Sequence, residues 1–341
     1  MSTEPEFPND PGTGLAARCQ ICSGRGGYVY ESIMRVLAHV HTFNDAKVIE
    51  QALDALRRQI RLPDAIVVVD NASKDDTLER ILSDDVTIIR NSANLGSSGA
   101  VAVGFAHALK QGFDWTWVLD ADSVPEPDAL ENLLSFFDGL PLAQQEQVSF
   151  LACRLAASGG GIEEHRPHVL TRAGVEFATI DPDSGCCQCD CFLWSGSLFR
   201  TAAVVKVGLP SADYFIDLAE LEYGYRARQL GLTGYVVNSC VLHQDVGRAP
   251  GISTRILRFG PFSFRLYELS PLRCYYHIRN MLYFWLYDCR PYRPRWIFRS
   301  VVHALLFPRT FAVRPFSHWQ HLIACLRGAW DGLTGHVERR Y

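Results

Sequence analysis

The amino-acid sequence predicts an α/β fold built on a mostly parallel, doubly wound sheet flanked by helices. From Arg35 onward, apolar runs alternate with amphipathic stretches joined by short links, and polar side chains follow several of these runs. Such alternation favours parallel strands joined by right-handed crossovers. Ligands bind such sheets at the carboxyl ends of the strands. The residues that directly follow each apolar run are therefore candidates for a functional site.

The first half of the chain shows the clearest alternation. We expect strands at 36–41, 65–70, 86–90 and 115–120, and helices at 49–60, 75–82, 99–110 and 127–137. The segment at 65–70 (AIVVVD) is a continuous apolar run closed by Asp70, as in a strand buried on both faces. The first helix is predicted from apolar residues at helical spacing, namely Ile49, Leu53, Leu56 and Ile60.

The second half is less regular, and we expect it to complete the sheet with strands at 189–194 and 233–242 and a helix at 219–230. The predicted organisation is a flexible extension at 1–33, a domain at 34–270 with halves at 34–150 and 151–270, and a helical C-terminal region rich in Arg and aromatic residues at 271–341.

The charge distribution is uneven along the chain. The 341 residues carry a net charge of -4, but residues 246–341 hold 15 Arg, no Lys and four acidic residues. This basic region favours an anionic partner such as lipid headgroups or a diphosphate. We expect no nucleic-acid partner, because no zinc-finger, homeodomain or RNA-binding signature is present.

The sequence carries no basic-then-apolar signal peptide, and the longest apolar run near its C-terminus is about seven residues, against ~20 for a spanning helix. We therefore expect a cytoplasmic protein, and the basic region leaves peripheral association with the inner face of the membrane open.

Polar clusters follow three of the apolar runs. Asp70 ends the second predicted strand, Asn94 and Gly96 follow the third, and Asp120 and Asp122 follow the fourth. Two carboxylates two residues apart can share a divalent cation, which can neutralise a departing diphosphate. An isolated Asp-x-Asp is more often a solvated turn, so the pattern needs support from its surroundings.

That support comes from an ordered set of segments in the first half: HTFND, VVVDNASKDDT, NLGSSGAVAVGF and LDADSVPEP. The second half adds SGSLFR, YFIDLAELEYGYRARQLG and VLHQDVG. The set spans roughly residues 35–290 and resembles family 2 glycosyltransferases of the GT-A fold. It is most similar to the rhamnosyl- and galactofuranosyl-transferring branch.

The resemblance implies an inverting, metal-dependent transferase that uses Mg²⁺ or Mn²⁺. It would move a sugar, rhamnose or galactofuranose, from a nucleotide diphosphate donor to a hydroxyl of a glycan or lipid-linked acceptor, in cell-surface polysaccharide biosynthesis. A catalytically silent nucleotide-sugar-binding protein on the same fold is the alternative. A dinucleotide-dependent oxidoreductase is excluded, because no G-x-G-x-x-G follows the first strand.

The resemblance also assigns donor-site roles. The nucleotide-sugar-binding residues would be Thr42, Asn44, Asp70, Asn94, Gly96 and Asp120, and the metal ligands would be Asp122, Asp120 and His243. Asp122 is the stronger ligand candidate of the two aspartates. His243 can equally be a partly buried histidine at a strand end.

The general base is less clearly indicated. The family pattern has an Asp two residues before a Glu, with an Arg four residues further on. Glu222 and Arg226 match this pattern, but Glu220 stands at the base position, and Asp217 is the other candidate. Both could instead be charges favoured at a helix N-terminus.

The cysteines suggest a zinc site, because thiolates at short spacings suit tetrahedral coordination. The candidates are Cys19-x-x-Cys22 and the group Cys186, Cys187, Cys189 and Cys191. Cysteines at alternate positions of a strand also serve as small apolar filler, and we favour that interpretation.

The C-terminal region contains YYHIRN at 275–280, which resembles a YY-x-x-RN segment of the same branch. Interleaved aromatic and Arg side chains suit an anionic membrane surface. The candidates for membrane contact are Trp285, Arg290, Arg293, Arg295, Trp296, Arg299, Trp319 and Trp330. Helices packed on the catalytic domain, with their Arg side chains solvated, are the alternative.

Overall fold

The computed structural model describes residues 34–81, 83–157, 167–171, 174–178, 184–244, 252–259, 262–289 and 318–337. Apart from Met34, these residues belong to one compact unit, Arg35–Tyr341. The predicted extension at 1–33, which includes Cys19 and Cys22, lies outside the described residues.

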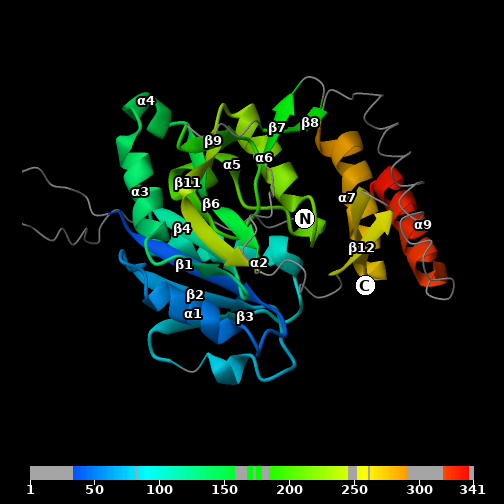
Figure 1. The fold of residues 1–341 in the computed structure, drawn as a ribbon, viewed down its shortest axis with the longest axis horizontal. Coiled ribbons are helices and arrows are strands. Elements are labelled where there is room, and N and C mark those ends of the chain that lie inside the picture. The colour runs from blue at the N-terminus through cyan, green and yellow to red at the C-terminus, as the bar shows by residue number, and fades with distance from the viewer. Residues whose placement is uncertain are drawn as a thin grey trace, which may run out of the picture. The chain divides into compact units, whose positions relative to one another are not determined.

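Among the described residues, nine strands form one sheet in the order β3-β2-β1-β4-β10-β6-β11-β5, with β9 paired to β11 (Figure 1). The strands are β1 (Val36–Thr42), β2 (Ala65–Asp70), β3 (Val86–Arg90), β4 (Trp115–Asp120), β5 (Val124–Pro125), β6 (Val148–Ala157), β9 (Cys186–Cys189), β10 (Ser197–Arg200) and β11 (Thr233–Gln244). The pairs β3–β2, β2–β1, β1–β4 and β6–β11 are parallel, and these six strands share one direction. In contrast, β10 runs antiparallel between β4 and β6, and β5 and β9 pair antiparallel with β11. The prediction of a mostly parallel sheet is confirmed.

Helices flank this sheet, as predicted. They are α1 (Ile49–Arg57), α2 (Gly96–Gln111), α3 (Ala129–Gly139), α4 (Leu142–Gln145), α5 (Thr201–Val207) and α6 (Ala219–Gln229). Helix α2 packs against β1, β2 and β4, and α3 packs against β6 and β11. The described strands also form two separate hairpins: β7 (His168–Thr171) with β8 (Gly174–Phe177), and β12 (Ile252–Phe259) with β13 (Phe262–Leu269).

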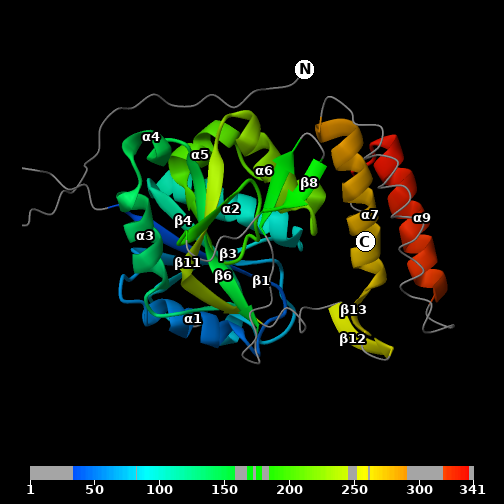
Figure 2. The ribbon, with the colours of Figure 1, turned by 45° about the horizontal axis from the view of Figure 1, so that its top comes forward.

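The C-terminal region is helical where it is described. Helix α7 (Pro271–Tyr283) continues into a π-helical turn (Phe284–Asp288), and α9 (His318–Thr334) packs beside α7 (Figure 2). No helix in the described part of the chain is long and apolar enough to span a bilayer. Trp285, a predicted membrane contact, is instead buried in the protein core, whereas Trp319 and Trp330 are exposed. The Arg and Trp candidates between residues 290 and 299 lie outside the described residues.

The predicted helix at 75–82 is wrong, because only a 3-10 turn forms there, Leu78–Arg80. The Asp75 carboxylate accepts hydrogen bonds from the backbone N–H and the hydroxyl of Thr77. Such local bonds compete with the helical pattern. The helix expected at 49–60 ends at Arg57, which leaves Ile60 exposed.

The strand expected at 189–194 is displaced, because β9 ends at Cys189. Asp190 then turns the chain: its carboxylate accepts hydrogen bonds from the Leu170 N–H at 2.7 Å and from Arg228 at 2.5 Å. Cys189 and Cys191 are buried, and burial raises the pKa of each thiol. No group of three or more His, Cys, Asp or Glu in the described ranges is arranged to hold a metal ion.

An aromatic cluster fills the core between the sheet and the helices α2 and α6. The rings of Phe105, Trp194, Phe199 and Tyr223 contact one another with centroids 5.1 to 6.4 Å apart. Large packed aromatic groups of this kind fix the elements that carry them. The first turn of α6 is thereby held against the sheet.

Candidate active site

A cavity of about 440 Å³ opens at the carboxyl ends of the parallel strands. One side, which we call the strand wall, comprises His41, Thr42, Asn71, Asn94, Gly96, Asp120, Asp122 and Gln244. The opposite side, the helix wall, comprises Phe215, Ile216, Asp217, Glu220, Ser270, Leu272 and Arg273. The strand wall lies where ligands bind in open α/β sheets.

Seven of the ten predicted site residues line this cavity. They are Thr42, Asn94, Gly96, Asp120, Asp122, Asp217 and Glu220. The other three, Asn44, Asp70 and His243, are not among the residues that line it. The predicted convergence of three strand ends is therefore present in the structure, together with both candidates for the base.

Asp120 and Asp122 are bridged by a single amide group. The Gln244 side chain donates to Asp120 at 2.7 Å and to Asp122 at 2.9 Å. Asp120 also pairs with the imidazole of His41 at 2.9 Å. Burial favours a higher pKa for Asp120, but the charge and hydrogen bond of His41, with the hydrogen bond from Gln244 and the charge of Arg273, together hold that pKa below its usual value.

Within the described ranges, no Lys, Arg or His side chain forms an ion pair with Asp122. Burial, and then the neighbouring charge of Asp120, raises the pKa of Asp122 to about 6. Two carboxylates held together against their mutual repulsion provide the hard oxygen ligands that divalent cations prefer. The pair therefore fits a divalent cation.

Asp70 and Asn44 do not line the cavity but form hydrogen bonds within the loops beside the strand wall. The buried Asp70 carboxylate accepts a hydrogen bond from the Ser73 N–H at 3.0 Å and contacts Arg90 at 3.3 Å. Asn44 has a left-handed backbone with φ of 60°, and its side chain accepts from the Lys74 N–H at 2.8 Å. Both residues thus fix the loops that follow β1 and β2.

His243 points away from the two aspartates. Its imidazole lies 2.5 Å from the Glu126 carboxylate, and the side chain is about half exposed. Successive side chains of a strand point to opposite faces, so Gln244 faces the aspartates instead. Sequence reasoning missed Gln244, although this alternation along β11 is the signal that could have identified it.

Gly96 begins α2 at the edge of the cavity with φ of +72°. A Cβ atom there would lie 2.1 Å from the carbonyl oxygen of Phe215. Asn94 accepts from the Gly96 N–H at 2.8 Å. Only glycine fits this close approach between the two walls.

The two candidates for the base differ in their surroundings. Asp217 forms an ion pair with Arg273 at 3.2 Å. Glu220 lies in the first turn of α6, and no other described side chain donates a hydrogen bond to it. Burial, and then the charges of Asp217 and Asp120, raises the pKa of Glu220 to about 7.

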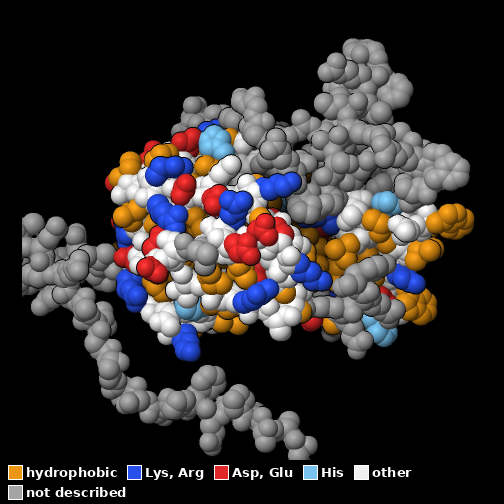
Figure 3. Space-filling model, turned by 90° about the horizontal axis from the view of Figure 1, so that it is seen from below, with side chains coloured by type: hydrophobic (Ala, Val, Ile, Leu, Met, Phe, Trp, Pro, Cys, Tyr) orange, Lys and Arg blue, Asp and Glu red, His pale blue; other side chains and the backbone are white. Residues whose placement is uncertain are grey.

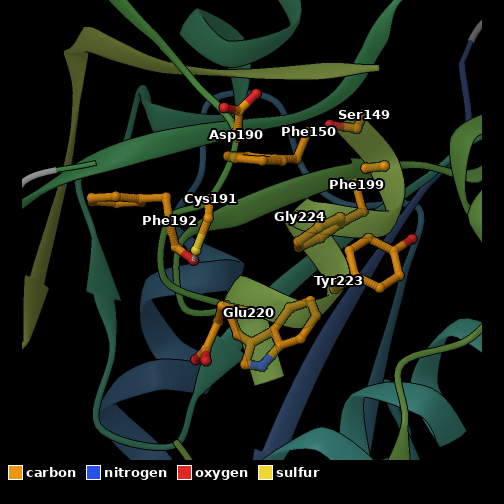
Figure 4. A pocket seen from close by; sticks show the side chains of 11 residues that line it. Ser149, Phe150, Asp190, Cys191, Phe192, Phe199, Glu220, Tyr223 and Gly224 are labelled. Carbon is orange, nitrogen blue, oxygen red and sulfur yellow. Dashed lines mark hydrogen bonds between the residues drawn. The ribbon is translucent and has the colours of Figure 1, made fainter. Parts of the chain in front are cut away.

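Glu220 also borders a small pocket on the core side of α6 (Figure 4). Figure 4 shows its carboxylate at one edge of this pocket, away from Asp190 at the opposite edge. Phe199 and Tyr223 lie among the apolar rings between them. This apolar backing accounts for the raised pKa of Glu220, because it disfavours the ionised carboxylate.

Glu222 and Arg226, which match the family pattern, serve the helix itself. Arg226 holds the buried Glu222 carboxylate through both oxygens, at 2.5 and 3.0 Å. It also donates to the carbonyl oxygens of Val207 and Leu209. This pair anchors α6 to the end of α5.

Comparisons with known proteins agree with this geometry. The model of the family "Glycosyl transferase family 2" matches residues 38–155. The chain is 32% identical over 223 residues to galactofuranosyltransferase GlfT1 of Mycobacterium tuberculosis, which covers 61% of this chain and 69% of that protein. It is 33% identical over 106 residues to an undecaprenyl-phosphate mannosyltransferase of Micrococcus luteus, which covers 30% of this chain and 43% of that protein.

Two solved structures share the fold. S. aureus TarS 1–349 in complex with UDP has a TM-score of 0.53 at 15% identity and covers 89% of this chain and 82% of that one. The mannosyltransferase PcManGT from Pyrobaculum calidifontis, in complex with GDP-Man and Mn²⁺, has a TM-score of 0.51 at 15% identity. The match covers 88% of this chain and 87% of that one. The fold is therefore GT-A, and the chain belongs to glycosyltransferase family 2, where it is galactofuranosyltransferase-like.

Proposed function

We propose that this glycosyltransferase is metal-dependent and inverting. It transfers galactofuranose or rhamnose from a nucleotide diphosphate donor to a hydroxyl of a glycan or lipid-linked acceptor. The observation that carries the proposal is one cavity with a carboxylate pair on each wall: Asp120 and Asp122 on the strand wall, and Asp217 and Glu220 on the helix wall. The names of the curated relatives favour galactofuranose.

Asp120 and Asp122 would hold Mg²⁺ or Mn²⁺, which when bound neutralises charge on the departing diphosphate. Gln244 already bridges the two carboxylates and would orient them. Thr42, Asn94 and Gly96 border the same wall and are proposed to contact the nucleotide sugar. Asn44, Asp70 and the loops they fix would support that contact.

Glu220 is the proposed general base. It would accept the proton of the acceptor hydroxyl as that oxygen attacks the anomeric carbon and the bond to the diphosphate breaks. A base works best when its pKa lies near the operating pH, and the pKa of Glu220 is raised to about 7. Asp217 is less suited, because its carboxylate is already paired with Arg273.

The test is a panel of UDP- and dTDP-sugars, with and without Mn²⁺, on the wild type and on Asp122→Ala. We expect one nucleotide sugar to raise the thermal midpoint and to release its nucleotide only with metal, and the variant to lose both effects. Binding without turnover by the wild type would favour the silent nucleotide-sugar-binding alternative. Binding that is the same with and without Mn²⁺, and the same in Asp122→Ala as in the wild type, would contradict the proposed donor site.

The second part of the proposal is peripheral binding to an anionic membrane surface at its cytoplasmic face. Exposed apolar side chains recur every three or four residues along α9, at Trp319, Ile323, Leu326, Trp330 and Leu333. Such spacing places them on one face of a helix. Figure 3 shows hydrophobic side chains at the end of the molecule where Figure 1 places α9.

The net positive charge of residues 246–341 complements an anionic surface. We expect the protein to sediment with phosphatidylglycerol-containing vesicles at low salt and to be released by high salt. A variant carrying both Trp319→Ala and Trp330→Ala should bind them less. Equal sedimentation with neutral phosphatidylcholine vesicles, or no sedimentation, would contradict this part of the proposal.

A further inference from the structure

The segment 213–218 leads into α6 and carries part of the helix wall. Three of its residues have a positive φ: Phe215 with 59°, Asp217 with 63° and Leu218 with 59°. L-residues rarely adopt this conformation, and the surrounding structure must offset its cost. The segment places Asp217 in the cavity and sets where α6 begins, and hence where Glu220 lies.

Asn280 of α7 holds this segment from one side. Its side-chain amide nitrogen lies 2.8 Å from each of the carbonyl oxygens of Tyr214, Ile216 and Asp217. Asn280 is 1% exposed, so water does not compete for these carbonyl groups. The two N–H groups of this amide are shared among the three carbonyl groups, and the Tyr214 carbonyl also accepts from the Ile216 N–H at 2.6 Å. One buried side chain therefore supplies hydrogen bonds to carbonyl groups that lie outside regular structure.

Arg279 supports Asn280. Its guanidinium is also buried and donates to the side-chain oxygen of Asn280 at 2.8 Å, which orients the amide nitrogen toward the segment. It donates as well to the carbonyl oxygens of Asp213 and, at 3.1 Å, of Val337. The guanidinium thus links the segment to the chain that follows α9.

The N-terminus of α2 holds the segment from the other side. The Ser98 N–H donates to the carbonyl oxygen of Phe215 at 3.2 Å, and the Ser98 hydroxyl donates to that of Ser211 at 2.7 Å. The ring of Tyr276, on α7, stacks on that of Phe215 with centroids 4.7 Å apart. The segment is therefore fixed between the N-terminus of α2 and helix α7.

We infer that Arg279 and Asn280 are positioning residues that set the place of Glu220 and Asp217 through the backbone of segment 213–218. Neither is among the residues that line the cavity. This inference rests on the proposed function, because it assigns the position of the proposed base to α7. It makes α7 part of the catalytic unit.

The test is Asn280→Leu, a substitution of similar size that removes the donor. Displacement of a reacting group by about 1 Å can cost ~100-fold in rate. We expect the kcat for UDP release from UDP-galactofuranose to fall at least 30-fold, while the Kd of UDP with Mn²⁺ changes less than threefold. We also expect the apparent pKa in the kcat–pH profile to move, because the distances from Glu220 to Asp217, Asp120 and His41 change.

Tyr275→Phe is the matched control. It removes a buried hydrogen bond of the same helix, from the Tyr275 hydroxyl to Asp331 at 2.7 Å, that does not involve the segment. We expect its kcat to stay within threefold of the wild-type value. The apparent pKa in its kcat–pH profile should stay within 0.3 units of the wild type. If Asn280→Leu does not fold, Arg279→Lys tests the same link with the charge retained, and we expect a smaller loss of kcat with the same selectivity.

A wild-type kcat and pH profile in Asn280→Leu would overturn the inference, as would equal losses in Tyr275→Phe or a parallel loss of UDP binding. The proposed function fails differently. In that case the wild type itself releases no nucleotide from any nucleotide sugar of the panel, or Glu220→Gln retains full activity.

Discussion

The two walls of the cavity are held in different ways. The strand wall is built at the ends of adjacent strands, and its aspartates are held by side chains from β1 and β11, His41 and Gln244. The helix wall stands on segment 213–218, and its backbone carbonyl groups are held by a helix more than 60 residues further along the chain.

This difference separates two tasks. The strand wall can hold a cation and a diphosphate in a geometry that the sheet fixes directly. The helix wall holds the proposed base, and its position depends on long-range hydrogen bonds to a strained segment. We therefore expect changes in the strand wall to affect metal and nucleotide binding, and changes in the helix wall to affect turnover.

The largest expected effect is that of Glu220→Gln. Loss of a general base typically costs about 10²–10⁴-fold, and we expect a fall of this size in the kcat for UDP release. Asp217→Asn is the matched control, and we expect a loss of less than about tenfold, because Asp217 is already paired with Arg273. The reverse order of the two losses, measured in the same assay, would make Asp217 the base.

The second comparison uses neighbouring residues of β11. Gln244→Ala removes the group that bridges Asp120 and Asp122, and loss of such a supporting contact typically weakens metal binding by about 10–100-fold. His243→Ala should change Mn²⁺ affinity less than about twofold, because its imidazole faces Glu126. Mn²⁺ titration monitored by UDP binding would measure both. A larger loss of Mn²⁺ affinity in His243→Ala than in Gln244→Ala would indicate that His243 is a metal ligand.

A smaller effect concerns pH. A base must be ionised, so kcat should rise as the pH increases through about 7, where the pKa of Glu220 lies. Asp217→Asn removes a negative charge that raises this pKa. The rise should then move to lower pH, by less than one unit. A kcat–pH profile that is unchanged in Asp217→Asn would show that the titrating group is not Glu220.

The smallest effect concerns stability. Burial raises the pKa of Glu220 from 4.5 in its ordinary state to about 7. The folded protein therefore binds this proton more tightly than the unfolded chain, and stability falls as the pH rises between those values. Glu220→Gln is neutral throughout, so it should raise the thermal midpoint by roughly 5 °C at pH 8 and by less than about 1 °C at pH 4.5. A lower midpoint at pH 8 would contradict the account of the buried carboxylate.

The strand wall could be predicted from the sequence to a large extent. Buried parallel strands are continuous apolar runs, so the residues that follow them, such as Asp120 and Asp122, are candidates by position, and the family resemblance of the surrounding segments supports their selection. Asn44 and Asp70 were placed at the correct strand ends, but their own hydrogen bonds turn them toward the loops. The resemblance predicts His243 as a ligand, whereas side-chain alternation along β11 turns Gln244 toward the aspartates and His243 toward Glu126.

The helix wall could be predicted only in part. Glu220 and Asp217 were recognised from the pattern around Glu222 and Arg226. The role of α7 could not be, because its contacts with the segment join residues 63 to 66 positions apart. The YYHIRN segment resembles a segment of the same branch, but the sequence does not reveal that Arg279 and Asn280 are buried and bonded to segment 213–218.

The most direct test of the two-wall account is calorimetric titration of UDP, with and without Mn²⁺, into the wild type, Asp122→Ala and Glu220→Gln. We predict that the wild type and Glu220→Gln bind UDP with the same Mn²⁺-dependent affinity, and that Asp122→Ala loses the dependence on Mn²⁺. The account would be contradicted if Asp122→Ala kept Mn²⁺-dependent binding, or if Glu220→Gln lost it.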